Sequence, residues 1–412
     1  MDEITSRLSL THRAWRLLPA ATRRRLVLRG AALIAPRIAA SPPTVSSGII
    51  VAGELTRASG LGESARLMLR GLRHLGIACW PLDIGPLLPA HRQDMPGPMT
   101  DRPPSGAALV LHVNGPMLPM VMARLPRSLV AGRRVVGFLV WELPALPAEW
   151  RAAARCMHHA WVPSRFAAGA IETVLPGRVR VVSFPVAVTP PRPAALDRPA
   201  FGLPDRAIVV LASANLASSF ARKNPLAAIA AFRAAFADCP DRILVLKLGN
   251  PDHFPADFAR IAEAVSGAPN IRLDTRTLPT ADALALTAAA DIVLSLHRSE
   301  GFGLVLAEAM LLGKPVVATG WSGNMDFMDE SCAMLVPCRL VPAIDPRHVY
   351  DLPGALWAEP DIPQAAALLR QLADDAGLRA TLGARARQAA ARLDARQLAD
   401  AIASLGLSPD RA

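Results

Sequence analysis

Cysteine is scarce in this chain of 412 residues, and its few thiols are scattered. The five cysteines stand at positions 79, 156, 239, 332 and 338, without a Cys-x-x-Cys pair or a Cys/His spacing typical of metal ligands. Isolated thiols of this kind are typical of a reducing cytosol, where cysteine serves as a small apolar residue. The pattern argues against a zinc site, and we expect neither a metal nor another cofactor.

Long uninterrupted apolar runs are also missing. No stretch approaches the roughly eighteen apolar residues that a membrane-spanning helix needs. Charges interrupt every apolar stretch near the N-terminus, which argues against a cleavable signal peptide. The chain is nevertheless 52% apolar with a mean hydropathy of +0.28, so it can bury sizeable cores. At this length two domains are the natural expectation.

Aromatic residues make up only 5% of the chain, which leaves little for stacking on single-stranded nucleic acid. The net charge of +11 does not restore that role, because more than half of it comes from residues 1–40, where eight arginines face Asp2 and Glu3. Residues 1–45 mix these arginines with apolar residues. Such a segment can lie on an anionic membrane surface or be a loosely docked basic tail, and both interpretations stay open. We expect no nucleic-acid partner.

Lysine is rarer still, since only three of the 45 basic residues are lysine: Lys223, Lys247 and Lys314. The preference for arginine runs through the whole chain, as in a GC-rich genome. Where a lysine persists against such a bias, its compact ammonium group is a candidate for a specific role. Chance is the alternative explanation at each position.

Two halves of alternating strands and helices are predicted from the pattern of apolar residues. In residues 46–190 the predicted strands are 48–52, 107–113, 134–140, 159–163 and 179–184, with helices at 63–75 and 165–174 among them. Prolines then cluster, which predicts an interdomain linker at 191–205. Residues 206–360 restart the alternation. Their predicted strands are 207–213, 242–248, 270–273, 291–296 and 315–319, and their predicted helices are 225–236, 256–265, 281–290 and 304–312.

The last part of the chain, residues 361–412, is rich in alanine, leucine and arginine and is predicted to be helical. Together the patterns predict an α/β protein with two doubly wound, Rossmann-like domains facing one another. Ligands of such sheets bind at the carboxyl ends of the strands. We therefore expect the site in a cleft between the domains.

The most informative segment contains Glu300-Gly-Phe-Gly and Glu308. It is predicted to run from a strand through a glycine-containing loop into a helix. Gly301 and Gly303 allow the backbone to approach a ligand closely, and the new helix would direct free N–H groups at it, which suits a diphosphate. The two carboxylates could each accept hydrogen bonds from sugar hydroxyls. Gly-x-Gly before a helix is common, but two glutamates separated by seven residues around Gly-Phe-Gly are more specific.

This segment resembles the E-x7-E signature of retaining glycosyltransferases with the GT-B fold, of the family 4 type (glycosyl transferases group 1). The resemblance extends over about residues 48–380 and is sharp over 291–320. It implies that Glu300 contacts the transferred sugar and that Glu308 holds the ribose of the nucleotide. It also implies that sugar and phosphate are bound by the backbone amides of Phe302, Gly303 and Leu304.

A second segment that matches the family is 215–225. In the family an arginine and a lysine after the first strand of the second domain neutralise the donor diphosphate, and Lys223 stands in the place of the lysine. The arginine expected about five residues earlier is missing, so Arg222 is the candidate substitute. A solvated charged turn is the alternative for this pair.

The N-terminal half offers further candidates. Gly62, in Gly60-Leu-Gly, is similar to the family's glycine loop, which closes over donor and acceptor. His112 ends a predicted strand and is a candidate catalytic residue near the reacting sugar, with a core histidine as the alternative. Glu142 follows the next strand and is a candidate acceptor contact, and Ser164 is a predicted helix cap.

The sequence thus predicts a retaining hexosyltransferase (EC 2.4) that moves a sugar from a nucleotide-diphosphate donor to a glycan or lipid-linked acceptor. Lys223 and helix amides would stabilise the leaving diphosphate electrostatically, without a metal. Exopolysaccharide or lipopolysaccharide synthesis, in the cytoplasm or peripherally on the inner face of the plasma membrane, fits the basic N-terminus. The alternatives are a GT-B sugar-nucleotide epimerase and a non-catalytic nucleotide-sugar-binding partner of a synthase.

Overall fold

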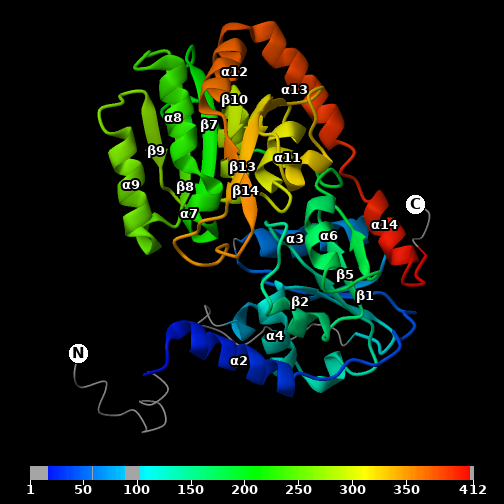
Figure 1. Cartoon of the computed structure of the whole chain (residues 1–412). Helices are drawn as coiled ribbons and strands as arrows, with labels where there is room; N and C mark the ends of the chain where they lie inside the picture. Colours follow the sequence, from blue (N-terminus) through cyan, green and yellow to red (C-terminus); the bar gives the residue numbers. More distant parts are fainter. Residues whose placement is uncertain (1–16, 58, 89–102, 409–412) are drawn as a thin grey trace.

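The computed structural model describes residues 17–57, 59–88 and 103–408. The chain forms two α/β domains stacked on one another, with the helix α2 (Ala20–Ile34) at the bottom of the lower one (Figure 1). Within the described ranges, no helix combines the length and apolarity that are needed to cross a bilayer.

The lower domain, called the N-domain here, is built on six parallel strands. They are β1 (Ile49–Gly53), β2 (Cys79–Asp83), β3 (Ala108–His112), β4 (Val135–Phe138), β5 (His159–Val162) and β6 (Val179–Val181), in the order β2-β1-β3-β4-β5-β6. The three central strands β1, β3 and β4 are buried over their whole length. Helices cover both faces of the sheet, which is why these strands are continuous apolar runs. The helices are α3 (Gly60–His74), α4 (Leu118–Arg124), α5 (Trp150–Ala154) and α6 (Arg165–Glu172).

The upper domain, called the C-domain here, repeats the plan with the strand order of a dinucleotide-binding fold. Its order is β12-β11-β10-β7-β8-β9, formed by β7 (Ile208–Asn215), β8 (Arg242–Gly249), β9 (Ile271–Asp274), β10 (Ile292–Ser295), β11 (Val316–Thr319) and β12 (Met334–Val336). The order reverses between β7 and β10, so the crevice for a ligand is expected at the carboxyl ends of these two strands. The helices are α7 (Phe220–Lys223), α8 (Pro225–Phe236), α9 (Pro255–Val265), α10 (Thr280–Ala289) and α11 (Leu304–Leu311).

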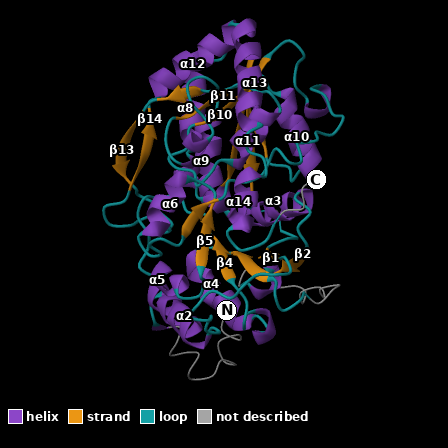
Figure 2. Cartoon of the chain, turned by 90° about the vertical axis from the view of Figure 1, so that its right-hand side faces the viewer, coloured by secondary structure: helices purple, strands orange, loops and turns teal. Residues whose placement is uncertain are grey.

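A small antiparallel sheet stands apart from the C-domain sheet (Figure 2). It pairs β13 (Cys338–Pro342) with β14 (Leu356–Pro360). The segment between these two strands reaches the N-domain, where Tyr350 packs on Trp141 with ring centroids 5.5 Å apart. The second half of the chain thus contributes directly to the core of the first.

The C-terminal helices divide between the two domains. Helices α12 (Ile362–Asp374) and α13 (Ala376–Ala390) pack on the C-domain, against α8 and α11. Helix α14 (Arg396–Ala403) returns to the N-domain, where Figures 1 and 2 both place it near α3. Leu398 and Ile402 share an apolar cluster there with Leu72 and Phe184, and the side chain of Gln397 accepts a hydrogen bond from the Ser183 amide at 2.9 Å. The chain end therefore ties the two domains together.

The predicted fold class, two doubly wound α/β domains, is confirmed. The predicted strands and helices agree with the observed ones to within about four residues at their ends. Four strands were missed, namely β2, β12, β13 and β14. β2 contains Pro81 and has one buried residue, and β13 has none, so neither gives a continuous apolar run. β12 is apolar but only three residues long. Of the basic segment 1–45, residues 1–16 lie outside the described ranges.

Candidate active site

The site lies where loops from both sheets meet. Lys223 follows β7 and Glu300 follows β10, so the two residues flank the point at which the C-domain strand order reverses. Loops at the carboxyl ends of the N-domain strands face them. Ser164, after β5, donates a hydrogen bond to the Gly301 carbonyl at 2.6 Å, and Arg165 binds Asp326 through its amide at 2.8 Å. The cleft that the topology predicts is here closed by direct contacts between the domains.

Glu300 is held between two cations and is only 8% exposed. Its carboxylate accepts a hydrogen bond from Lys223 Nζ at 2.5 Å and lies 3.4 Å from Arg222 Nη1. Burial acts to raise the pKa of Glu300, but Lys223, Arg222 and the nearby His297 outweigh it and lower the pKa to about 2. Glu300 is therefore a firmly ionised carboxylate with a lysine at hydrogen-bond distance.

The backbone of the Glu300 loop is fixed by residues of the loop that follows β11. Ser322 accepts a hydrogen bond from the Glu300 amide at 2.9 Å, and the Gly323 amide donates to the Glu300 carbonyl at 2.9 Å. Ser322 has a φ of 84°, which is uncommon for a residue with a side chain and costs free energy. A Cβ on Gly323 would lie 2.5 Å from the Gly301 carbonyl carbon, so only glycine fits there. The loop conformation is thus set by its neighbours and not by its own sequence alone.

The three residues predicted to offer backbone amides stand at the start of α11. Phe302 is 2% exposed and packs between Phe184 of the N-domain and Phe327. Gly303 has a φ of 102° and caps the helix that begins at Leu304, and no side chain of the described residues caps it. The first amides of an α-helix have no partner within the helix, and the helix dipole makes this end positive. This helix start suits an anionic ligand next to Lys223.

Glu308 lies one turn further along α11 and faces α3 of the N-domain. Its pKa is raised to about 7, chiefly by burial and further by Glu63, while Arg70 acts in the opposite direction. Glu63 is itself paired with Arg66 at 2.8 Å and with Arg70 at 2.5 Å. In the absence of a ligand Glu308 is therefore about half protonated near neutral pH.

Arg222 was predicted as the substitute for the missing diphosphate arginine, and the structure places it in the protein interior. Its side chain is 2% exposed. The guanidinium donates to the Ser299 carbonyl at 2.8 Å and to Ser218 Oγ at 2.7 Å, and it lies between Glu300 and Glu142. Protein atoms surround the guanidinium on all sides, so the geometry does not favour a direct contact between Arg222 and a diphosphate.

Two of the N-domain candidates, His112 and Gly62, are also buried. His112 is 1% exposed, with Nδ1 2.7 Å from Ser64 Oγ and its ring stacked on Phe138 at 4.6 Å. Burial lowers its pKa to about 3, so the ring is neutral. This geometry favours the core histidine among the two interpretations. Gly62 lies in the first turn of α3, and its amide donates to Ser59, the helix cap, at 3.0 Å. A Cβ there would lie 2.5 Å from the Glu54 carbonyl oxygen, so close packing explains this glycine.

Several residues that shape the site were not found from the sequence: Ser218, His297, Ser299, Ser322, Asn324 and Tyr350. The loop after β11 shows why. Ser322 Oγ bonds Asn324 Oδ1 at 3.3 Å, and His297 Nε2 lies 3.1 Å from the same oxygen. Ser322-Gly-Asn follows a predicted strand, which is the position at which polar residues of such sheets meet ligands. That signal was available for these loop residues, whereas nothing local marks Tyr350. Among the described residues, no cluster of three or more histidine, cysteine, aspartate or glutamate side chains could hold a metal ion.

Fold and site together define a protein with two Rossmann-like domains and a Lys–Glu pair at the start of a helix between them. Comparison with known proteins agrees with this description: residues 207–350, which contain this pair, match the family model of the glycosyl transferases group 1. The resemblance to a group 1 glycosyltransferase with the GT-B fold is thereby confirmed.

A curated relative agrees with this match. A D-inositol 3-phosphate glycosyltransferase of Salinispora arenicola (strain CNS-205) is 31% identical over 221 residues. That match covers 53% of this chain and 45% of the relative, so the chain spans about half the length of the curated relative it matches.

Two solved structures share the fold. Anabaena HepE in complex with UDP and glucose has a TM-score of 0.60 at 15% identity, and the match covers 87% of this chain and 100% of that chain. A glycosyltransferase from Rickettsia africae ESF-5 has a TM-score of 0.61 at 11% identity, and the match covers 88% and 98%. At such low identities the likeness shows the GT-B fold and not the substrate.

Proposed function

We propose that this protein transfers a hexose from a nucleotide-diphosphate sugar to a glycan or lipid-linked acceptor, with retention of the anomeric configuration. The observation that carries the proposal is the Lys223–Glu300 pair, 2.5 Å apart across the C-domain switch point and beside the start of α11. The group 1 family and the UDP complex of the HepE structure support a nucleotide sugar as donor. Retention and the hexose are carried over from the family resemblance.

Each residue of the pair would have one task. Lys223 would turn from Glu300 to the donor diphosphate, which would also accept hydrogen bonds from the first amides of α11. The negative charge of the leaving nucleoside diphosphate would then be stabilised electrostatically and without a metal ion. Glu300 would accept hydrogen bonds from the hydroxyls of the transferred sugar, and Glu308 from the ribose. Phe302, fixed in the core, would hold the amides in place. An oxocarbenium-like sugar would then form between the closed domains.

Substitution of the pair tests this assignment. UDP-glucose and other nucleotide sugars would be screened by thermal shift, and transfer would be measured as nucleoside diphosphate released in the presence of a lipid or glycan extract. We expect Lys223→Ala to weaken donor binding and transfer, and Glu300→Gln to lower transfer on the order of a hundredfold while UDP still binds. Lys247→Ala is the matched control, because this lysine, near the carboxyl end of β8, binds the Arg276 carbonyl and lies 3.8 Å from Asp274, whereas Lys223 pairs with Glu300.

The same assay separates the alternatives. Unchanged transfer in both site variants would show that the site is wrongly assigned. Donor binding without any turnover would indicate a non-catalytic nucleotide-sugar-binding partner of a synthase. Conversion of the donor into an epimeric nucleotide sugar, with no acceptor needed, would indicate a sugar-nucleotide epimerase.

We also propose that the N-domain meets an anionic membrane surface through α2, as a peripheral protein on the inner face of the plasma membrane. Leu28 and Ala31 of α2 pack on Met120, while Leu33 and Ile34 are 86% and 72% exposed. Exposed apolar residues next to arginines favour insertion into an anionic interface. Lipid-linked acceptors of exopolysaccharide or lipopolysaccharide synthesis would be met at such a surface.

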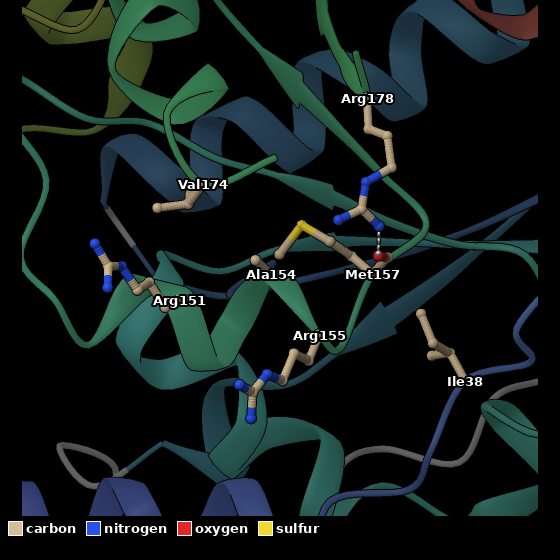
Figure 3. A pocket seen from close by; sticks show the side chains of 7 residues that line it. All are labelled: Ile38, Arg151, Ala154, Arg155, Met157, Val174 and Arg178. Carbon is tan, nitrogen blue, oxygen red and sulfur yellow. Dashed lines mark hydrogen bonds between the residues drawn. The ribbon is translucent and has the colours of Figure 1, made fainter. Parts of the chain in front are cut away.

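A hollow beside this helix adds to the basic face. It has a volume of about 450 Å³, and Figure 3 shows Arg151, Arg155 and Arg178 around a floor that includes Met157. Ile38, just after α2, also lines it. Phosphatidylglycerol vesicles should therefore sediment with the protein and phosphatidylcholine vesicles should not. Replacement of Leu33 and Ile34 by glutamate should abolish this binding and leave turnover of a soluble acceptor unchanged. Equal binding to both vesicles would contradict the proposal.

A further inference from the structure

A charged cluster is buried between the two domains, and the reaction proposed above does not account for it. At its centre is the guanidinium of Arg222, with Nη1 3.4 Å from Glu300 of the C-domain and Nη2 3.8 Å from Glu142 of the N-domain. Its Nε is buried and has no partner among the described residues. Burying a charge is costly unless other charges and hydrogen bonds compensate it. We therefore expect this buried cluster to have a function that explains why its cost in folding free energy is tolerated.

Glu142 is oriented by groups of the C-domain. Tyr350 donates its hydroxyl hydrogen to Glu142 Oε2 at 3.0 Å, and Ser299 Oγ donates to the Glu142 backbone carbonyl. The Tyr350 ring also lies 5.5 Å from the Arg222 guanidinium carbon, within the range of a cation–π contact. Arg222, Tyr350 and Ser299 come from three segments of the C-domain, and Glu142 completes the arrangement only when the domains are in contact.

The charges in the cluster balance when no ligand is present. Glu300 and Glu142 face Arg222 and Lys223, two of each sign when both carboxyl groups are ionised. Burial raises the pKa of Glu142, and Arg222 acts to lower it. A donor diphosphate that draws Lys223 away would leave Glu300 with one cation, Arg222. If Arg222 were removed as well, Glu300 would have no cation beside it, and a carboxylate so deeply buried would take up a proton.

We propose that Arg222 is not the diphosphate ligand but a positioning residue that keeps Glu300 ionised and in place when Lys223 turns to the donor. Glu142 and Tyr350 are positioning residues that hold Arg222 from the opposite side, so the sugar-contacting carboxylate is set only in the closed form. The inference deepens the proposed function and depends on it for the role of Lys223. Glu142 is thereby assigned the role of holding Arg222, in place of the acceptor contact expected from the sequence.

The test measures protons taken up when UDP binds, by calorimetry at pH 7 in buffers of different ionisation enthalpy. Charged or titratable groups that face Glu300 are Lys223, Arg222, His297, Glu142 and Tyr350. In Arg222→Gln, UDP and Glu300 compete for Lys223, so Glu300 should be protonated when UDP binds. The uptake on binding should therefore exceed that of the wild type by as much as one proton per molecule. Ionisation of Glu308 contributes equally to both proteins and cancels in the difference.

Two further variants keep the test sharp. Arg222→Gln combined with Glu142→Gln removes one charge of each sign, and so retains a neutral cluster should the single variant fail to fold. Arg198→Gln is the matched control, because Arg198 is a structural arginine of the C-domain paired with Asp291 at 2.6 Å, away from the site. It should bind UDP with the proton uptake of the wild type.

Turnover provides the second measurement. In Arg222→Gln, kcat should fall at least tenfold between pH 8 and pH 6 while the wild type stays level, and the UDP dissociation constant should change less than threefold at pH 8. Tyr350→Phe should lower kcat and leave KM unchanged. Equal proton uptake in Arg222→Gln and wild type would overturn the inference, as would a loss of UDP affinity as large as that of Lys223→Ala. A wild-type protein that binds UDP but transfers no sugar would refute the proposed function and leave the calorimetric test intact.

Discussion

Glu308 gives the most quantitative prediction, because its protonation links the stability of the fold to donor binding. Its carboxyl lies on α11 against α3, and burial and Glu63 raise its pKa from 4.5 to about 7. In the unfolded chain the carboxyl ionises near its ordinary pKa. Between pH 4.5 and 7 the unfolded state thus loses a proton that the folded state keeps, so stability falls as pH rises through this window and levels off above it.

Replacing Glu308 by glutamine removes this titration. One pKa unit corresponds to about 1.4 kcal/mol, so the full shift would amount to about 3 kcal/mol. The side chain is partly exposed, and solvent screening reduces this to about 1–3 kcal/mol. We expect Glu308→Gln to be no more stable than the wild type at pH 4.5 and more stable by that amount above pH 7. For a domain of this size the melting temperature would rise by roughly 2–10 °C.

Donor binding should change in the opposite direction. An ionised Glu308 would accept hydrogen bonds from the ribose hydroxyls, and a hydrogen bond to a charged group contributes about 1.5–3 kcal/mol. Wild-type UDP binding should tighten as pH rises through 7, whereas Glu308→Gln should bind at least tenfold more weakly at pH 8 and without this dependence. The variant would be more stable and less functional, as is common where a buried ionisable group lowers stability but is needed for binding.

Thermal unfolding of the ligand-free protein from pH 4.5 to 8.5 measures the stability term, and titration with UDP measures the binding term. Glu330→Gln is the control, since this glutamate is exposed on a loop and should follow the wild type. A stability difference between Glu308→Gln and wild type that stays constant from pH 5 to 8 would refute the reasoning. So would a variant that is less stable at pH 8.

Three further substitutions test the packing at the site and the N-terminal cap of α12. Gly301→Ala would place a Cβ 3.0 Å from the Trp141 carbonyl oxygen of the N-domain, so it should cost about 1–3 kcal/mol in urea unfolding, and an unchanged stability would contradict this close approach. Phe302→Ala removes a ring that is 2% exposed and should cost about 3–5 kcal/mol in urea unfolding; a loss below about 1 kcal/mol would mean that the cavity collapses. Asp361→Ala removes the carboxylate that accepts from the Gln364 amide at 3.0 Å and should cost about 1 kcal/mol, most of which Asp361→Asn should restore.

The candidate residues show which parts of the site can be predicted from residues that follow predicted strands, and which cannot. Lys223 and Glu300 are 77 positions apart in the chain, yet each follows a predicted strand, and parallel strands bring their carboxyl ends to one edge. Their meeting could therefore be anticipated. The same rule pointed to His112 and to Glu142, but it does not say whether a side chain turns toward the ligand or toward the core. His112 turns onto Phe138, and Glu142 turns to Arg222.

The sequence by itself determined the two alternating α/β halves, the Glu300–Glu308 loop and helix, and Lys223 beside them, because apolar periodicity and glycine placement act locally. Only the tertiary structure decided what lies across the interface. From the sequence, Arg222 is interpreted as a solvated or ligand-binding charge. In the folded protein it is buried against Glu142 and Tyr350. A local pattern fixes a helix or a strand end, whereas the burial of a charge depends on groups that are distant in sequence and meet only when both domains have folded.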